Sequence, residues 1–312
     1  MHRRLLPAVL LVACAAAACG PSQPGAAAHP TRTVAAPAAA AAATGGSAPP
    51  ATRTLVLHTA DGERSALVHH PADVAAGSPL VVVLHPAGAS AGDAQARFGW
   101  DAVAERDGLV VAYPEGSLDG FQDTWNGGRC CPPASDLGTD DVGFLDALVR
   151  TLRRTDGVGR QVYAVGFSNG AIMAYAWACA RPGTLAGVGV VAGALMTGCG
   201  APGALTVVAV HGDADDRIPL GGGTTPTGAV LPALEQSLSA FHPAPRCGSP
   251  ADVTATPAAR VTVYRCADGT RVVQDVVTGL GHAWPGAGAA AGSTPGPLDA
   301  TGFLWAQLRP GA

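Results

Sequence analysis

Short apolar runs rich in valine recur along the chain from residue 54 onward. Such runs, bounded by turn residues, predict buried strands. The eight predicted strands are Thr54–His58, Ala66–His69, Leu80–Leu84, Leu109–Tyr113, Gln161–Val165, Gly187–Val191, Leu205–Val210 and Val272–Val277. Asp61 and Gly62 lie between the first two strands and predict a hairpin turn, so we expect this pair to be antiparallel.

Segments with helical periodicity separate the later runs. They predict five helices, at Gln95–Arg106, Asp141–Arg153, Asn169–Ala180, Leu231–Phe241 and Leu298–Leu308. Nearly continuous apolar strands that alternate with helices indicate a parallel sheet covered on both faces. The predicted class is therefore α/β, with a mostly parallel eight-stranded sheet in the arrangement of an α/β-hydrolase fold. Reactive groups are then expected beyond the carboxyl ends of the strands.

The N-terminal part of the chain has a different composition. A basic start followed by a short apolar stretch indicates a signal peptide over residues 1–19. Cys14 and Cys19 both follow residues that resemble a lipobox, so cleavage near either one predicts a lipid-anchored protein. The alternative is cleavage at an Ala-x-Ala site and secretion. Residues 20–52, mostly Ala, Pro, Gly, Ser and Thr, predict a flexible tether, and residues 53–312 suit one α/β-hydrolase domain.

Charge and cysteine content exclude some functions. The net charge is −4, only 13% of residues are charged, and the 19 basic residues are all arginine. No basic stripe suits nucleic acid, so that class of partner is excluded. Six cysteines remain outside the signal peptide, and an even number in an exported chain favours disulfides. Their spacing does not fit a zinc site, and we expect neither a metal nor another cofactor.

The cysteine positions suggest three pairs. Cys247 and Cys266 flank a segment expected to end in a hairpin. Cys179 ends the helix that begins at residue 169, and Cys199 follows the next strand. This assignment leaves adjacent cysteines, Cys130 with Cys131, as the third pair.

The segment Gly166-Phe167-Ser168-Asn169-Gly170 joins an apolar strand directly to a helix of small residues. This strand, G-x-S-x-G turn and helix form the pattern of a nucleophile elbow, in which a sharp turn lifts a serine hydroxyl above the sheet. The same pattern occurs around Ser90, but that serine lies in a loop several residues past a strand. Ser168 is therefore the predicted nucleophile. The N–H of Asn169, the next residue, is an expected oxyanion donor.

A histidine base and a carboxylate should follow the serine in the chain. Of the three later histidines, His282 lies in a glycine-flanked loop directly after the last predicted strand, and it is the predicted base. His211 stands where a strand ends and is expected to order that loop. The carboxylate should follow the strand Leu205–Val210, where the pattern does not rank three residues: Asp213, Asp215 and Asp216.

Several motifs together resemble the polyhydroxybutyrate-depolymerase and feruloyl-esterase branch of carbohydrate esterase family 1, especially its exported lipoprotein-like esterases. The resemblance spans roughly residues 54–308. The motifs that carry it lie at residues 124–126 with 130–131, 140–145, 166–170, 211–219 and 281–286. It implies that Asp215, four residues after His211, is the triad carboxylate.

The same resemblance bears on the second oxyanion donor. The family usually has His-Gly and then a small residue after the corresponding strand, whereas this chain has His85-Pro86-Ala87-Gly88. Proline has no N–H. Because the family donor is the residue that follows, the resemblance implies Ala87, with Gly88 in reserve.

The combined prediction is an exported serine esterase that hydrolyses feruloyl, acetyl or short hydroxyalkanoate esters through an acyl-enzyme. Its partners would be an ester substrate and, through an N-terminal lipid, the cell membrane. Trp284 and Trp125 would line an acyl pocket; each would otherwise be a partly buried loop aromatic. The alternatives are a polyhydroxybutyrate depolymerase proper, an acyltransferase to a cell-envelope hydroxyl, and a non-catalytic tethered binding lipoprotein.

Overall fold

The computed structural model describes residues 51–118, 123–224, 228–243, 246–286 and 298–311. The predicted signal peptide, both lipidation cysteines and the predicted tether as far as residue 50 lie outside these ranges. Within them, no helix combines the length and the apolar character needed to cross a membrane.

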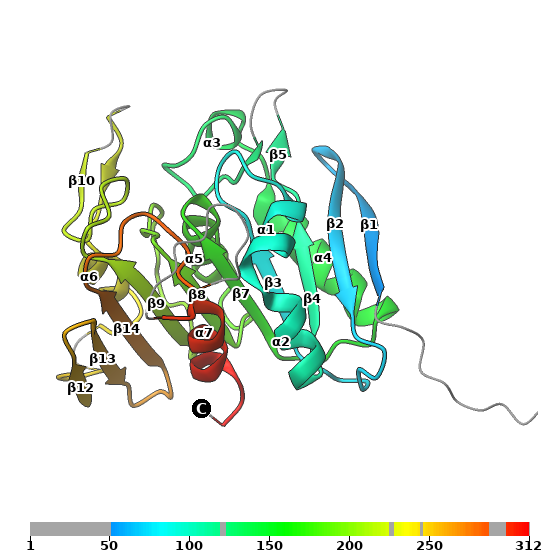
Figure 1. Cartoon of the computed structure of the whole chain (residues 1–312). Helices are drawn as coiled ribbons and strands as arrows, with labels where there is room; N and C mark the ends of the chain where they lie inside the picture. The colour runs from blue at the N-terminus through cyan, green and yellow to red at the C-terminus, as the bar shows by residue number, and fades with distance from the viewer. Residues whose placement is uncertain (1–50, 119–122, 225–227, 244–245, 287–297, 312) are drawn as a thin grey trace, which may run out of the picture. The chain divides into compact units, whose positions relative to one another are not determined.

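A ten-stranded sheet runs through the described part of the chain, in the order β1-β2-β4-β3-β7-β8-β9-β14-β13-β12 (Figure 1). Its six central strands, from β4 to β14, are parallel, and an antiparallel hairpin flanks them at each edge. The strands are β1 (Ala51–Thr59), β2 (Gly62–His70), β3 (Leu80–Leu84), β4 (Val110–Pro114), β7 (Val162–Phe167), β8 (Gly187–Val191), β9 (Thr206–Gly212), β12 (Asp252–Ala255), β13 (Ala259–Arg265) and β14 (Arg271–Val277). Two small hairpins pair β5 (Ser117–Leu118) with β6 (Asp123–Thr124) and β10 (Gly223–Thr224) with β11 (Val230–Leu231).

The α/β class and the mostly parallel sheet are confirmed, but the predicted number of strands was wrong. The prediction lacked β12 and β13, which extend the sheet beyond β14. Strand β12 is exposed along its whole length, so it has no apolar face to reveal it. At the other edge, β1 begins at Ala51, where Ala51 and Thr52 pair with β2. The last two residues of the predicted tether therefore belong to the sheet.

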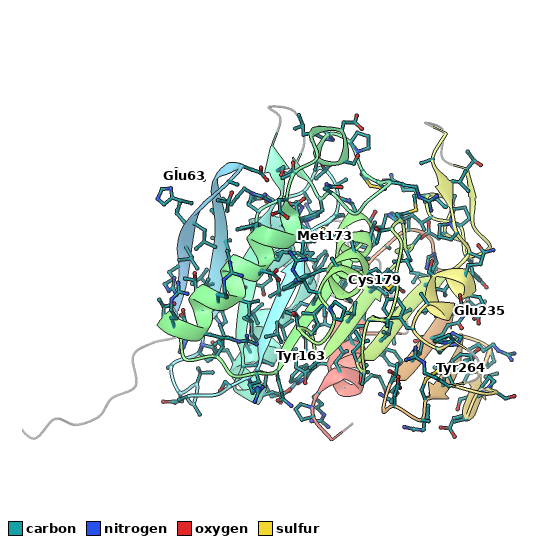
Figure 2. All side chains as sticks on the ribbon, turned by 180° about the vertical axis from the view of Figure 1, so that it is seen from behind. Glu63, Tyr163, Met173, Cys179, Glu235 and Tyr264 are labelled. Carbon is teal, nitrogen blue, oxygen red and sulfur yellow. A yellow bond between two sulfur atoms is a disulfide. The ribbon has the colours of Figure 1, made fainter. Side chains whose placement is uncertain are left out.

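Helices cover both faces of this sheet. Helices α1 (Ala91–Phe98), α2 (Trp100–Asp107) and α7 (Ala300–Leu308) pack on one face. Helices α4 (Asp141–Thr155), α5 (Asn169–Ala180) and α6 (Leu234–Ser239) pack on the other. Figure 2 looks onto this second face, where Met173 and Cys179 mark α5 and Glu235 marks α6. A four-residue helix, α3 (Ala134–Leu137), lies outside these layers in the chain segment between β6 and α4.

Three helix predictions differ from the structure for local reasons. The predicted helix at Gln95–Arg106 is two helices, because Gly99 adopts a left-handed conformation with φ 72°. The helix predicted from Leu231 begins at Leu234, since Pro232 disfavours helical geometry at the residue before it and Leu231 pairs in β11. The last helix begins at Ala300 instead of Leu298.

The structure contains the three predicted disulfides, Cys130–Cys131, Cys179–Cys199 and Cys247–Cys266. The second ties the end of α5 to the segment after β8. The third closes the excursion that contains β12 and β13.

Candidate active site

Ser168 occupies the turn between β7 and α5. Its backbone has φ 55° and ψ −119°, a conformation that residues other than glycine rarely adopt. A hydrogen bond from the Ser168 N–H to the Val191 carbonyl, 3.0 Å long, ties the turn to β8. The glycines on either side permit it: a Cβ on Gly166 would lie under 3.0 Å from the backbone of Gly170. This close packing presents the Ser168 hydroxyl at the carboxyl end of the sheet.

The structure brings Ser168, His282 and Asp215 into one chain of hydrogen bonds. The His282 Nε2 atom lies 2.9 Å from the Ser168 Oγ. On the other side of the ring, Nδ1 lies 2.9 Å from Oδ2 and 3.1 Å from Oδ1 of Asp215. The three residues follow β7, β14 and β9, which are parallel strands that end at the same edge of the sheet.

Asp215 is buried, and its carboxylate has further donors. The backbone N–H groups of Arg217 and Ile218 each donate to Oδ1 at 2.9 Å. Burial by itself raises the pKa of this carboxyl, but the bond to His282 and these backbone bonds outweigh it, so the net pKa is lowered. Asp215 is thus held as an anion directly beside the His282 ring.

The two neighbouring aspartates have other surroundings. The Asp213 Oδ1 accepts the N–H of Gly279 at 2.6 Å, which fastens the loop after β9 to the loop after β14. Asp216 is exposed. His211 is buried and orders the same loop: its Nε2 donates to the Ile218 carbonyl at 2.7 Å, and burial lowers its pKa. Only Asp215 of the three aspartates contacts His282.

The loop after β3 carries Ala87. Ala87 and Asn169 both line the same cavity as Ser168 and His282. No described residue accepts a hydrogen bond from the backbone N–H of Ala87 or Asn169. The Gly88 N–H, in contrast, donates to the Asp123 carbonyl at 2.9 Å and is already engaged.

His85 holds the start of this loop as a neutral imidazole. Its Nδ1–H donates to the Pro86 carbonyl at 2.9 Å, and its Nε2 accepts the Gly116 N–H at 2.9 Å. Burial lowers the pKa of His85 to about 4. The Glu115 carboxylate lies 3.4 Å from Nε2, but this contact is no ion pair, because Nε2 accepts a hydrogen bond from the Gly116 N–H and the ring is uncharged.

Trp125 has a structural position, which corrects its prediction as a pocket residue. Its side chain is fully buried, and it lines neither of the two cavities that contact His282. The indole Nε1 donates to the His85 carbonyl at 3.0 Å. The Asn169 side chain completes the support: its Oδ1 accepts the Trp125 N–H at 2.7 Å, and its Nδ2 donates to the Trp125 carbonyl at 2.9 Å.

Sequence reasoning missed this role of the Asn169 side chain. An amide offers a donor and an acceptor together, which is what an extended backbone needs. These two hydrogen bonds therefore join Asn169, the first residue of α5, to Trp125, which in turn supports the loop that carries Ala87. Asn169 contributes its backbone to the cavity and its side chain to the wall behind it.

Ser90, the serine of the second G-x-S-x-G pattern, caps a helix. Its hydroxyl accepts the Asp93 N–H at 3.1 Å, and its backbone N–H donates to the Asp93 Oδ2 at 3.1 Å, which is a capping box. The local sequence around Ser90 thus starts α1, whereas the same spacing around Ser168 makes an elbow.

The sequence of the chain is similar to the sequences of several esterases. No protein-family model matches the chain. A protein named as an esterase, NocK of Nocardia uniformis subsp. tsuyamanensis, is 34% identical over 236 residues, 67% of this chain and 66% of that protein. Feruloyl esterase C of Emericella nidulans is 30% identical over 231 residues, 71% of this chain and 72% of that protein. The chain belongs to the feruloyl-esterase-like esterases of the α/β-hydrolase family.

Solved structures support the same fold. The acetyl xylan esterase from Aspergillus awamori matches with a TM-score of 0.53 at 14% identity, covering 74% of this chain and 94% of that one. An S-formylglutathione hydrolase from Agrobacterium tumefaciens matches with a TM-score of 0.51 at 12% identity, covering 75% of this chain and 89% of that one. At such identities the likeness concerns the fold alone. The alignment to the Nocardia relative spans about two thirds of that protein's length.

Two cavities contact His282 in this esterase, and the larger of them also contacts Ser168. The larger, of about 610 Å³, is lined by Pro86, Ala87, Arg97, Cys130, Cys131, Phe167, Ser168, Asn169, Ile172, Arg217, Ile218, Leu231 and His282. The smaller, of about 90 Å³, is also lined by His282, and in its wall Trp284 stacks on Phe98 at 4.2 Å between ring centroids. The Trp284 Nε1 donates to the Thr301 Oγ1 at 3.1 Å. Trp284 is therefore a wall of the small cavity, two residues from His282.

Proposed function

We propose that the chain is a serine esterase that cleaves carboxylic esters through an acyl-enzyme. The observation that supports this most directly is the His282 ring, which lies 2.9 Å from both the Ser168 Oγ and an Asp215 oxygen. In the first half-reaction, the Ser168 Oγ attacks the ester carbonyl while Nε2 of His282 takes its proton. The same proton then passes to the departing alcohol.

In the second half-reaction, His282 takes a proton from water, and the resulting hydroxide attacks the acyl carbonyl. The bond to the Ser168 Oγ breaks, and His282 returns the proton to it. Asp215 holds Nδ1–H and stabilises the imidazolium that forms in each half. The N–H groups of Ala87 and Asn169, which line the cavity without a described acceptor, would stabilise the tetrahedral oxyanion.

For the substrate, we propose feruloyl, acetyl or short hydroxyalkanoate esters. Relatives named as feruloyl esterases support the first class, and a cavity of about 610 Å³ has room for an aromatic acyl or alcohol group. We further propose that the protein acts outside the cytoplasm, because three disulfides suit an oxidising compartment. A lipid at Cys19 or Cys14 would tether it to the membrane.

Replacement of the serine tests this function. Ser168→Ala should lower kcat toward 4-nitrophenyl acetate and methyl ferulate by at least about 10⁴-fold, the scale of losing a triad nucleophile. Ser90→Ala is the matched control, because it removes the same group from the second G-x-S-x-G pattern. It should cost about 1 kcal/mol of stability through the lost helix cap while turnover continues. Equal losses in the two variants would refute the assignment of Ser168.

A further inference from the structure

Two arginines line the larger cavity beside the serine. Arg97 lies in the last turn of α1, and Arg217 lies in the loop after β9, two residues beyond Asp215. Both share the cavity wall with Ser168 and His282. The reaction proposed above uses neither guanidinium, since a neutral ester has no charge for it to bind.

The charged side chains that line the cavity are of one sign. Among the residues described, its lining includes two arginines and no carboxylate. Asp215 lies behind the wall, but its oxygens are occupied by His282 and by backbone N–H groups. The charged side chains of the described lining are therefore both cationic, in a chain whose net charge is −4.

The two guanidinium groups differ in how far they are engaged. Arg97 lies 3.2 Å from the Asp93 carboxylate in an i,i+4 pair. The side chain of Arg217 is exposed, and no described residue pairs with it or accepts a hydrogen bond from it. Among the residues that the structure describes, none uses the guanidinium donors that Arg217 brings to the cavity lining.

A guanidinium fork matches the two oxygens of a carboxylate, and a cavity lined by one sign of charge concentrates ligands of the opposite sign. We propose that this cavity selects esters that carry a carboxylate, and that Arg217 binds that carboxylate while Arg97 adds to the positive field. The proposal rests on the proposed function for the reacting ester. It goes further by naming the charge of the substrate and the residue that binds the charged group.

Matched esters test the selection. Mono-4-nitrophenyl glutarate and 4-nitrophenyl valerate differ by a carboxylate in place of a methyl group on the acyl side. 4-Carboxyphenyl butyrate and 4-methylphenyl butyrate differ in the same way on the alcohol side. In one of these pairs, kcat/KM should favour the anionic ester, mainly through a lower KM. The pair that shows the preference identifies the side of the ester that faces Arg217.

Arg217→Gln should reduce that anionic-to-neutral ratio about tenfold, the scale of one charge-assisted hydrogen bond, and Arg217→Lys should restore part of it. Arg97→Gln should reduce the ratio less, because Arg97 is already paired. Arg160→Gln is the control: it removes the same charge just before β7, at the end of that strand opposite Ser168, and should leave the ratio unchanged. The ratio should also fall as salt is raised, since surface charges are screened.

A binding measurement separates this proposal from the proposed function. Calorimetry on the Ser168→Ala protein, which should not turn over, should show the anionic ester of one pair binding more tightly than its neutral counterpart: monomethyl glutarate against methyl valerate for the acyl side, or the two aryl butyrates for the alcohol side. The difference should shrink when Arg217→Gln is added. If no ester is hydrolysed but this difference persists, the reaction assignment fails and the anion site stands. Hydrolysis without any charge preference, or a preference that Arg217→Gln leaves intact, would overturn the anion site.

Discussion

At the scale of single residues, three aspartates within four positions have separate tasks. Asp213 fastens two loops through the Gly279 N–H, Asp216 is exposed, and Asp215 faces His282. The backbone N–H bonds from Arg217 and Ile218 fix the Asp215 side chain before any substrate arrives. The turn after β9 therefore fixes the orientation of the Asp215 carboxylate.

Asp215→Asn should lower kcat by about 10⁴-fold, because an amide favours the wrong tautomer of His282. The fold should persist, since the Asn oxygen still accepts both backbone N–H groups. Asp213→Asn is the matched control and should cost about 1 kcal/mol of stability through a weakened turn bond, with little change in kcat. Ester kinetics and thermal unfolding of both variants measure these effects. A comparable kcat loss in Asp213→Asn would contradict the proposed role of Asp215.

At the scale of elements, the site depends on how closely α5 approaches β3. A Cβ on Gly170 would lie under 3.0 Å from the carbonyl oxygens of Leu84 and His85. The strand β3 ends at Leu84, and the loop with Ala87 follows directly. The small residue at Gly170 thus lets the start of α5 and the Ala87 loop meet across one cavity.

Gly170→Ala should therefore destabilise the protein by about 1–3 kcal/mol and lower kcat, because α5 and the loop must move apart. Gly92→Ala provides the same substitution at the last glycine of the second G-x-S-x-G pattern. Its Cβ would meet only the Ser90 Oγ at an ordinary 3.7 Å, inside helix α1. It should be neutral or stabilising by up to about 1 kcal/mol. Urea unfolding and ester kinetics of the pair decide, and equal effects would contradict the close-packing argument.

At the scale of the whole molecule, buried titratable groups make stability depend on pH. Burial lowers the pKa of three histidines, His85, His211 and His242. Each is neutral in the folded state, so the unfolded chain binds more protons below the ordinary histidine pKa of 6.5. Burial of Asp275 acts in the opposite direction and raises its pKa to about 6. The overall slope is a balance, and single contributions need a variant to isolate them.

The contribution of His85 should be fully present above pH 6.5 and should be lost progressively as the pH falls toward 4. A pKa lowered from 6.5 to about 4 corresponds to about 3 kcal/mol across that window. The difference in unfolding free energy between the unsubstituted protein and His85→Gln should therefore shrink by about 3 kcal/mol between pH 7 and pH 4. Urea unfolding at several pH values measures it. Parallel curves for the two proteins would contradict a neutral, buried His85.

Much of this protein follows from its sequence alone. The central strands are apolar on both faces, so each appears as a continuous run whatever its neighbours are. Ser168 stands out because strand, turn and helix are adjacent in the chain, and the helix that begins at Asn169 was predicted with its observed ends. The strands at one edge of the sheet, β12 and β13, were not predicted, and β12 has no buried face to create a pattern.

Tertiary structure alone decided what depends on contacts between distant segments. Asp213, Asp215 and Asp216 share one loop, and only the position of the loop after β14 determines which of them meets His282. The residues around Trp125 in the sequence do not show whether it lines a pocket or is buried behind one. Its hydrogen bond to the His85 carbonyl shows that it is buried and supports the loop. Arg97 and Arg217 lie on separate elements, and folding alone brings their charges to one cavity. Secondary structure depends mainly on residues that are close in the chain. Which of several similar side chains enters the site depends on contacts between segments that only the fold brings together.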